Sequence, residues 1–267
     1  MSRPSSAGPD EQAPMSRPGS NRPTSKGELY RDVGVVLRTY KLGESDRIVV
    51  VMTAENGKVR AVAKGVRKTR SKFGARLEPM SHVRLILYRG RELDIVNQAE
   101  SVEPLTPLLS SLDRVSQGLA AIEAIDQLAL DREPNERLYR QAVGVLRTIA
   151  KQPAALTVPA FYWKLLAAEG LEPQLDECVR CGEFGADTPM VAFDLNEGGV
   201  LCRSCRSGTS ISPAALDIMR AILGGRLNDM LDLPDSPATH EVGVLATRAL
   251  EHHIERRLKA VAMFEQH

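Results

Sequence analysis

The stretch VGVVLRTYKLGESDRIVVVMTAENGKVRAVAKG, residues 33–65, contains three apolar runs separated by the turn sequences KLGESD and AENG. Runs with β-branched or alternating apolar residues, bounded by Gly, Asn, Asp and Ser, are typical of β-strands. Two similar runs follow, so we expect five strands, at Val33–Tyr40, Arg47–Thr53, Lys58–Val66, His82–Arg89 and Glu92–Gln98. Five strands in about 70 residues predict a small closed barrel of the OB type.

The third of these strands has two different faces. Small apolar residues occupy alternate positions, at Val59, Ala61 and Ala63. The other face holds Lys58, Arg60, Val62 and Lys64. Because successive side chains of a strand point to opposite faces, one face can pack in a core while the other displays positive charge.

A basic segment continues from this strand. Residues 58–76, KVRAVAKGVRKTRSKFGAR, hold eight basic residues and no acidic one, namely Lys58, Arg60, Lys64, Arg67, Lys68, Arg70, Lys72 and Arg76. A merely solvated surface favours charges of mixed sign. Long cationic side chains on a flexible loop can instead follow a phosphate backbone without reading bases, so the segment predicts DNA binding.

Three neighbouring residues extend this prediction. Phe73 is the aromatic residue of the basic segment, and it either stacks on a base or plugs the end of the barrel. Lys41 and Arg47 flank the first turn and would enlarge the DNA-binding surface.

The charge is distributed unevenly along the chain. The net charge of +1 is close to neutral, but residues 30–105 hold 15 basic and 9 acidic residues, whereas residues 106–267 hold 16 and 22. A basic front half joined to an acidic rear half indicates that the anionic partner binds the front.

After Pro107 the apolar period changes from two residues to about 3.6, which predicts helices. Two amphipathic stripes are visible: Leu112, Val115, Leu119, Ile122 and Ile125, and then Leu138, Ala142, Val145, Leu146 and Ile149. A third helix is expected at Pro159–Glu169. Two more should start at Ser212-Pro213 and Ser236-Pro237, each an N-cap followed by proline, and extend to about Leu223 and Phe264.

All four cysteines lie in one segment of the rear half, as two CxxC pairs separated by twenty residues: Cys178, Cys181, Cys202 and Cys205. This spacing is that of a four-cysteine zinc ribbon. Disulfides and a redox pair are the alternatives, but a cytosolic chain disfavours disulfides and a redox pair needs no second copy. We therefore expect one structural Zn²⁺ per chain.

Catalysis is not expected. Four thiolates leave no open position on the metal, and the zinc deaminases place H-x-E before their cysteines, whereas His253-Ile254-Glu255 follows them here. No Ser/His/Asp set and no GxxxxGKS loop is present. Residues 1–28 are rich in Pro, Ser, Gly and Arg and predict a disordered tail. No apolar run approaches the eighteen residues of a membrane span, so we expect a cytoplasmic protein without a membrane partner.

Several segments together resemble the bacterial recombination-mediator family RecO. These are YRDVGVVLRTYKLGESDRIVVVMTAENGKVRAVAKGVRK (30–68), LEPMSHVRLILYRGRELDIVNQAE (77–100), FYWKLLAAEGLEPQLDECVRCG (161–182) and GGVLCRSC (198–205). The resemblance covers about residues 29–265 and leaves out only the tail.

The resemblance implies an α+β multi-domain protein. Its parts would be an OB-fold DNA-binding domain at 29–105, a helical domain at 106–175 and 210–267, and a zinc-binding insert at 176–209. Members of this family bind single- and double-stranded DNA and anneal complementary strands. They contact the single-stranded-DNA-binding protein SSB through its C-terminal tail, act with RecR and in many bacteria RecF, and help to load RecA.

On this basis we expect SSB to dock on the helical half, beside Arg132, Arg137 and Arg140 or beside Arg256, Arg257 and Lys259. Two other classes stay open on the residues alone. One is a zinc-ribbon scaffold or transcription regulator, and the other is a zinc-dependent hydrolase.

Overall fold

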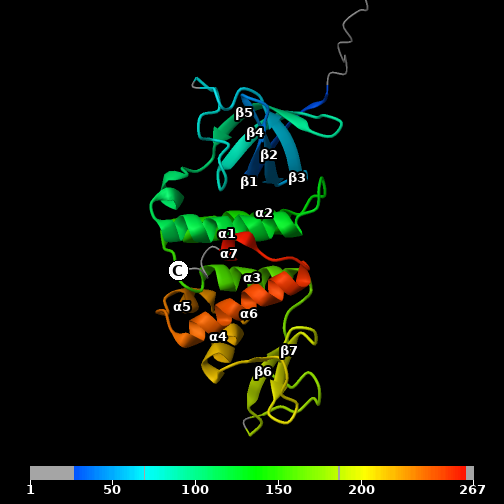
Figure 1. The fold of residues 1–267 in the computed structure, drawn as a ribbon, viewed down its shortest axis with the longest axis vertical. Coiled ribbons are helices and arrows are strands. Elements are labelled where there is room, and N and C mark those ends of the chain that lie inside the picture. Colours follow the sequence, from blue (N-terminus) through cyan, green and yellow to red (C-terminus); the bar gives the residue numbers. More distant parts are fainter. Residues whose placement is uncertain (1–26, 69, 186, 263–267) are drawn as a thin grey trace, which may run out of the picture.

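Residues 27–68, 70–185 and 187–262 are described by the computed structural model, and they form three parts stacked along the long axis of the molecule (Figure 1). A β-barrel lies at one end, a group of helices lies in the middle, and a small sheet bearing the cysteines lies at the other end. The expected fold class, a barrel followed by a helical part with a four-cysteine insert, is confirmed.

The barrel is built from five strands: β1 (Leu29–Leu42), β2 (Asp46–Thr53), β3 (Gly57–Ala63), β4 (His82–Tyr88) and β5 (Asp94–Ser101). They close in the order β1-β2-β3-β5-β4, with β3 and β5 parallel and the other neighbours antiparallel. This is a five-stranded Greek-key barrel of the OB kind. All five expected strands are present, and β1 begins four residues earlier than its expected start.

The interior of the barrel is lined by residues from all five strands, and on β2, β3 and β4 these residues alternate along the strand. On β3 the interior residues are Val59, Ala61 and Ala63, each fully buried, as the alternation predicts. The register of β1 shifts between Val36 and Arg38, and Leu37 belongs to the core shared with the helices. One outer face of the barrel therefore packs on the helical part instead of facing solvent.

The described residues of the helical part contain a short 3-10 helix η1 (Thr106–Leu109) and seven α-helices. Their bounds are α1 (Leu112–Leu128), α2 (Glu136–Lys151), α3 (Thr157–Ala168), α4 (Pro213–Leu223), α5 (Leu227–Leu231), α6 (Pro237–His253) and α7 (Lys259–Ala262). Ser212 and Ser236 accept hydrogen bonds from backbone N–H groups of the first turns of α4 and α6, and proline follows each of them. Both predicted helix starts are thus confirmed.

The last helix is shorter than the sequence predicts. It was expected to reach about Phe264, which lies outside the described residues, but α6 ends at His253 and a new short helix begins at Lys259. Glu255 has a left-handed φ of 51°, which a helix does not contain. Carboxylates of α1 and α6 stabilise the chain after the break. Glu123 accepts hydrogen bonds from the N–H groups of Lys259 and Ala260, and Glu251 accepts one from the N–H group of Leu258.

The cysteine-bearing insert contains strands β6 (Met190–Asp194), β7 (Gly199–Cys202) and β8 (Thr209–Ser210), ordered β7-β6-β8. Phe193 of β6 meets Trp163 of α3 edge to face, with ring centroids 5.9 Å apart. Both side chains are almost fully buried, so the insert shares one apolar core with the helices.

Polar contacts hold the barrel against α1 and the α1–α2 connection. Arg132 donates to the fully buried Asp94 of β5 at 2.8 Å, and Tyr30 also donates to that carboxylate. The backbones touch as well, because a Cβ added to Gly57, which has a φ of +65°, would lie 1.9 Å from the carbonyl oxygen of Glu133. The barrel and the α1–α2 connection are therefore in close contact at this interface.

Candidate nucleic-acid interface and metal centre

The loop between β3 and β4, residues 64–81, carries most of the basic segment at the end of the barrel. Seven exposed cations lie on β3 and this loop: Arg60, Lys64, Arg67, Lys68, Arg70, Lys72 and Arg76. Within the part of the chain that the structure describes, none of the seven lies within 4.0 Å of a carboxylate oxygen. Lys41, at the end of β1, is likewise exposed and has no such partner among the described residues. The surface therefore carries positive charge that the protein itself does not neutralise.

The basic loop is anchored at both ends, although the sequence suggested a flexible one. At its start, the N–H of Gly65 donates to Asp46 at 2.7 Å, and the N–H of Arg67 donates to the carbonyl of Ser45 at 3.0 Å. At its end, the N–H of Met80 donates to the carbonyl of Val36 at 2.8 Å. The backbone is thus held at the two ends of the loop, which lowers the entropy lost when the cations near these ends bind a ligand.

Phe73 is one of the side chains that anchor this loop. Its ring is 1% exposed and packs in the barrel core with Leu77, while the Lys72 ammonium lies 4.9 Å from the ring centroid. Of the two alternatives for Phe73, the structure favours the plug at the end of the barrel, because a buried ring is not accessible to a base. The sequence could not decide this, since it does not show which side chain fills the barrel's open end.

Two basic residues of the expected surface have acidic partners. Lys58 donates to the backbone carbonyl of Asp126 at 2.8 Å, and its ammonium lies 3.6 Å from the carboxylate of Asp126 and 3.8 Å from that of Asp131. Its side chain is only 14% exposed. Arg47 pairs with Glu78 at 2.7 Å. Lys58 therefore belongs to the interface between the barrel and the helices and not to the unneutralised surface.

The structure also shows an exposed aromatic residue that the sequence analysis did not select. Tyr40, near the end of β1, is 41% exposed, and the guanidinium carbon of Arg38 lies 5.3 Å from its ring centroid. Simple alternation from Val36, whose side chain is in the barrel core, would place Arg38 and Tyr40 inside the barrel. The bulge between Val36 and Arg38 reverses this, so that both side chains lie outside.

The four cysteines converge at the far end of the molecule. Their Sγ atoms all lie within 4.8 Å of one another, and those of Cys181 and Cys202 are 3.7 Å apart. Sulfurs bound tetrahedrally to zinc at about 2.3 Å would be separated by about 3.8 Å, so the cluster has the dimensions of a metal site. No disulfide joins these cysteines. The four predicted ligands are thus brought together by the fold.

The protonation of the cluster favours a bound cation. Burial raises the pKa of Cys178, but backbone N–H donors at Cys202, Cys181 and Arg180 outweigh it and lower that pKa to about 6. The pKa of Cys205 is raised to about 12, first by its hydrogen bond with Cys181 and then by burial. Four thiols this close cannot all ionise unless a positive charge compensates them, and a coordinating metal ion supplies that charge.

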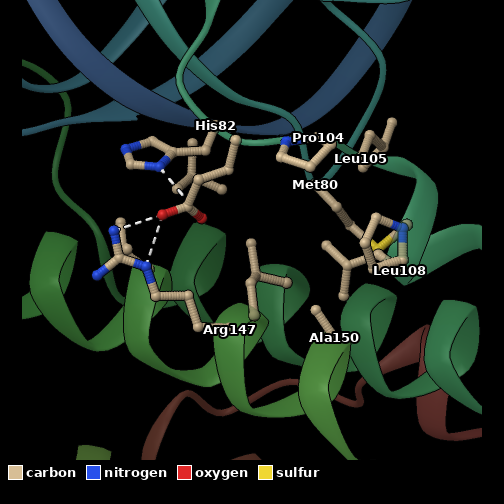
Figure 2. Close-up of a pocket in the computed structure, with 12 residues that line it drawn as sticks. Met80, His82, Pro104, Leu105, Leu108, Arg147 and Ala150 are labelled. Carbon is tan, nitrogen blue, oxygen red and sulfur yellow. Dashed lines mark hydrogen bonds and ion pairs between the residues drawn. The ribbon is translucent and has the colours of Figure 1, made fainter.

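A cavity of about 190 Å³ lies where the barrel meets α2 and the connection that follows β5 (Figure 2). Its walls are mostly apolar and include Met80, Leu105 and Leu108. At its edge Arg147 donates to Glu103 at 2.6 Å, and the Nδ1 atom of His82 lies 3.7 Å from the same carboxylate. Burial lowers the pKa of His82, although Glu103 opposes this effect. The cavity is therefore an apolar hollow with a polar edge.

The geometry defines a class of protein: an OB barrel with an unneutralised basic surface, joined to a helical part with a four-cysteine cluster that could hold a metal ion. Comparison with protein-family models agrees with this class. The model for the N-terminal part of recombination protein O matches residues 28–105, and the model for its C-terminal part matches residues 109–262. The chain therefore belongs to the recombination protein O family, whose members mediate recombination and DNA repair. None of the helices in the described ranges has the length and hydrophobicity of a transmembrane segment.

Proposed function

We propose that this protein binds single- and double-stranded DNA without sequence specificity, anneals complementary strands and helps to load the RecA recombinase onto SSB-coated single strands at the nucleoid. The observation that carries the proposal is the set of seven exposed cations on β3 and the loop 64–81, which have no carboxylate within 4.0 Å among the described residues. Membership of the recombination protein O family supports the same role.

The chemistry of these cations explains both activities. Arginine and lysine side chains that contact phosphates position a nucleic acid but do not read its sequence. A mediator of repair needs this indifference, because a break can occur in any sequence. Two strands repel each other through their phosphates, and a surface that neutralises part of this charge brings them close enough to pair.

The salt dependence of DNA binding tests this proposal. Each phosphate contact on a single strand contributes about 0.7 to the slope of log affinity against log salt. Changing Arg67, Lys68, Arg70 and Lys72 to Ala should therefore lower this slope by about two to three units. Fluorescence anisotropy with labelled oligonucleotides of unrelated sequence measures the slope, and affinity should fall alike for all of them, with annealing weakened in parallel.

A matched control removes four exposed cations from the helical part, by changing Arg137, Arg140, Arg226 and Arg248 to Ala. This variant should keep the wild-type slope. A folded loop variant that also keeps the wild-type slope would show that the basic loop does not contact phosphates. Binding that depends strongly on sequence would favour a transcription regulator instead.

We propose further that the metal is Zn²⁺, with one ion per chain held by Cys178, Cys181, Cys202 and Cys205. The four-thiolate set, the tetrahedral dimensions and the burial of Cys178 and Cys202 support zinc in a structural role. When bound, the ion supplies a fourfold crosslink between the two CxxC turns, and with four protein ligands it has no position for a substrate.

The proposed partners are SSB, through its acidic C-terminal tail with an apolar end, and RecR, with RecF in some bacteria. Of the first expected basic cluster, Arg132 pairs with Asp94 and Arg140 pairs with Glu136 at the surface, whereas Arg137 has no carboxylate partner among the described residues. The cavity beside α2 combines apolar walls for the apolar end of such a tail with the Arg147 guanidinium at its edge. Arg147 is paired with Glu103, so an acidic tail would take the place of Glu103 beside the guanidinium. We therefore propose this cavity as the docking site of the SSB tail.

A further inference from the structure

The outer surface of the barrel carries a short apolar row next to the basic loop. Tyr40 on β1 is the register partner of Ile48 on β2, and Ile48 is the partner of Val62 on β3. Cross-strand partners point to the same face of a sheet. Val49, which follows Ile48 on β2, and Ala61, which precedes Val62 on β3, lie in the barrel core, so the row faces outward. Ile48 and Val62 are half-buried and Tyr40 is 41% exposed.

Cations border this row. Arg60 lies two residues before Val62 on the same outer face of β3, and Lys64 is the first residue after this strand; both are exposed. The basic loop lies against the β1–β2 turn, because the Arg67 guanidinium donates to the carbonyl of Gly43 at 3.4 Å. The row is therefore continuous with the surface that we propose for phosphates.

The orientation of Tyr40 is supported from the helical part. Arg38 pairs through Nε with the carboxylate of Asp126 at 2.8 Å, and the side chain of Asp126 is only 4% exposed in α1. The guanidinium carbon of Arg38 lies 5.3 Å from the centroid of the Tyr40 ring, which is within the range of a cation–π contact. The buried carboxylate thus fixes Arg38, and Arg38 limits the motion of the aromatic ring.

We propose that Tyr40 stacks on a base of single-stranded DNA, that Arg60 and Lys64 hold the neighbouring phosphates, and that Arg38 is a positioning residue for the ring. This inference rests on the proposed DNA binding and deepens it by adding a base contact. Aromatic stacking tolerates every base, because each base has a flat face, so it is compatible with binding to any sequence. It also favours single strands, since the bases of a duplex are already stacked.

The test compares Tyr40→Ala with Tyr40→Phe and with Tyr88→Ala. Tyr88 is a matched control, because it is also 41% exposed but lies on β4. Tyr40→Ala should bind a single-stranded oligonucleotide about 5- to 100-fold more weakly, with the salt slope unchanged because the ring carries no charge. Tyr40→Phe and Tyr88→Ala should bind within about twofold of wild type, since the first keeps the ring and the second lies elsewhere.

An oligonucleotide of the same length made of abasic residues isolates the stacking contact. Wild type and Tyr40→Ala should bind this strand equally, because it offers phosphates without bases. Arg38→Lys keeps the charge but loses the flat guanidinium face, so its smaller loss of affinity should also be confined to strands with bases. Circular dichroism verifies that each variant is folded.

The inference is overturned if Tyr40→Ala binds base-bearing strands as tightly as wild type, or if it loses the same factor on the abasic strand. An equal loss with Tyr88→Ala would overturn it too. These outcomes differ from a failure of the proposed function, in which wild type itself would show no salt-dependent binding to unrelated single strands.

Discussion

At the scale of single residues, two basic side chains on one strand have different surroundings. Lys58 and Arg60 are two positions apart and both point away from the barrel interior. Lys58 is 14% exposed and lies beside Asp126 and Asp131, whereas Arg60 is exposed without a carboxylate within 4.0 Å among the described residues. Because the charge of Lys58 is already neutralised, only Arg60 offers its charge fully to DNA.

Single substitutions separate these two roles. Lys58→Ala should lower the free energy of unfolding by about 1.5–3 kcal/mol, because it removes a charge-assisted hydrogen bond to the carbonyl of Asp126 while the buried Asp126 carboxylate keeps Arg38. It should leave the salt slope of DNA binding unchanged. Arg60→Ala should change stability by less than about 0.5 kcal/mol and lower the slope by about 0.7. Urea denaturation and anisotropy titrations measure both, and a reversed assignment of the two effects would contradict the structure.

At the scale of elements, the insert depends on its cysteines more than on its strands. β7 has four residues and β8 has two, which is too little sheet to be stable alone. The turns at the two CxxC pairs bring four sulfurs within 4.8 Å of one another, and Phe193 of β6 packs on Trp163 of α3. A metal ion would therefore stabilise the insert and, through this contact, the helical core.

Cys202→Ser tests this coupling, since Cys202 ends β7 and is 1% exposed. We expect loss of the metal in elemental analysis and a lower unfolding temperature of the helical part. Structural zinc contributes about 10–16 kcal/mol of apparent binding free energy in small zinc-finger peptides. DNA affinity should stay within about twofold of wild type, because the barrel lies at the other end of the molecule.

Arg203→Ser, at the exposed neighbouring position, is the control and should keep the metal. Freshly purified wild type that contains no zinc, with its thiols free, would refute the proposed identity of the ion.

At the scale of the whole molecule, the barrel and the helices together form the cavity beside α2 (Figure 2). Met80 and His82 come from the barrel side, Leu105 and Leu108 from the connection, and Arg147 from α2. Neither part by itself forms this hollow. A partner bound there would touch both the DNA-binding part and the helical part.

Binding of a labelled peptide with an acidic stretch and an apolar C-terminal residue tests the proposed docking of SSB. Arg147→Ala should weaken this binding about tenfold, because it removes a charge-assisted hydrogen bond and leaves Glu103 to repel the peptide. Arg140→Ala, on the same helix, is the matched control and should bind normally. A normal affinity for Arg147→Ala, with a loss for Arg140→Ala or Arg256→Ala, would place the tail on one of the other basic clusters.

The sequence by itself determined the features that depend on neighbouring residues. Alternation predicted the strands and the buried face of β3, proline after serine predicted the starts of α4 and α6, and the CxxC spacing predicted that the four cysteines lie together. Such patterns are readable because strand alternation, helix capping and ligand turns act over only a few residues. The resemblance to a known family added the order of the domains along the chain.

Only the tertiary structure decided which side chains are free to act. Phe73 fills the end of the barrel, Lys58 is neutralised by α1, and Tyr40 stays exposed beside Arg38. The break after His253 likewise depends on Glu123, which is distant in sequence. In each case the outcome depends on a segment that is remote along the chain but adjacent in the fold. Burial and ion pairing arise from such contacts between remote segments, and no local sequence pattern encodes them.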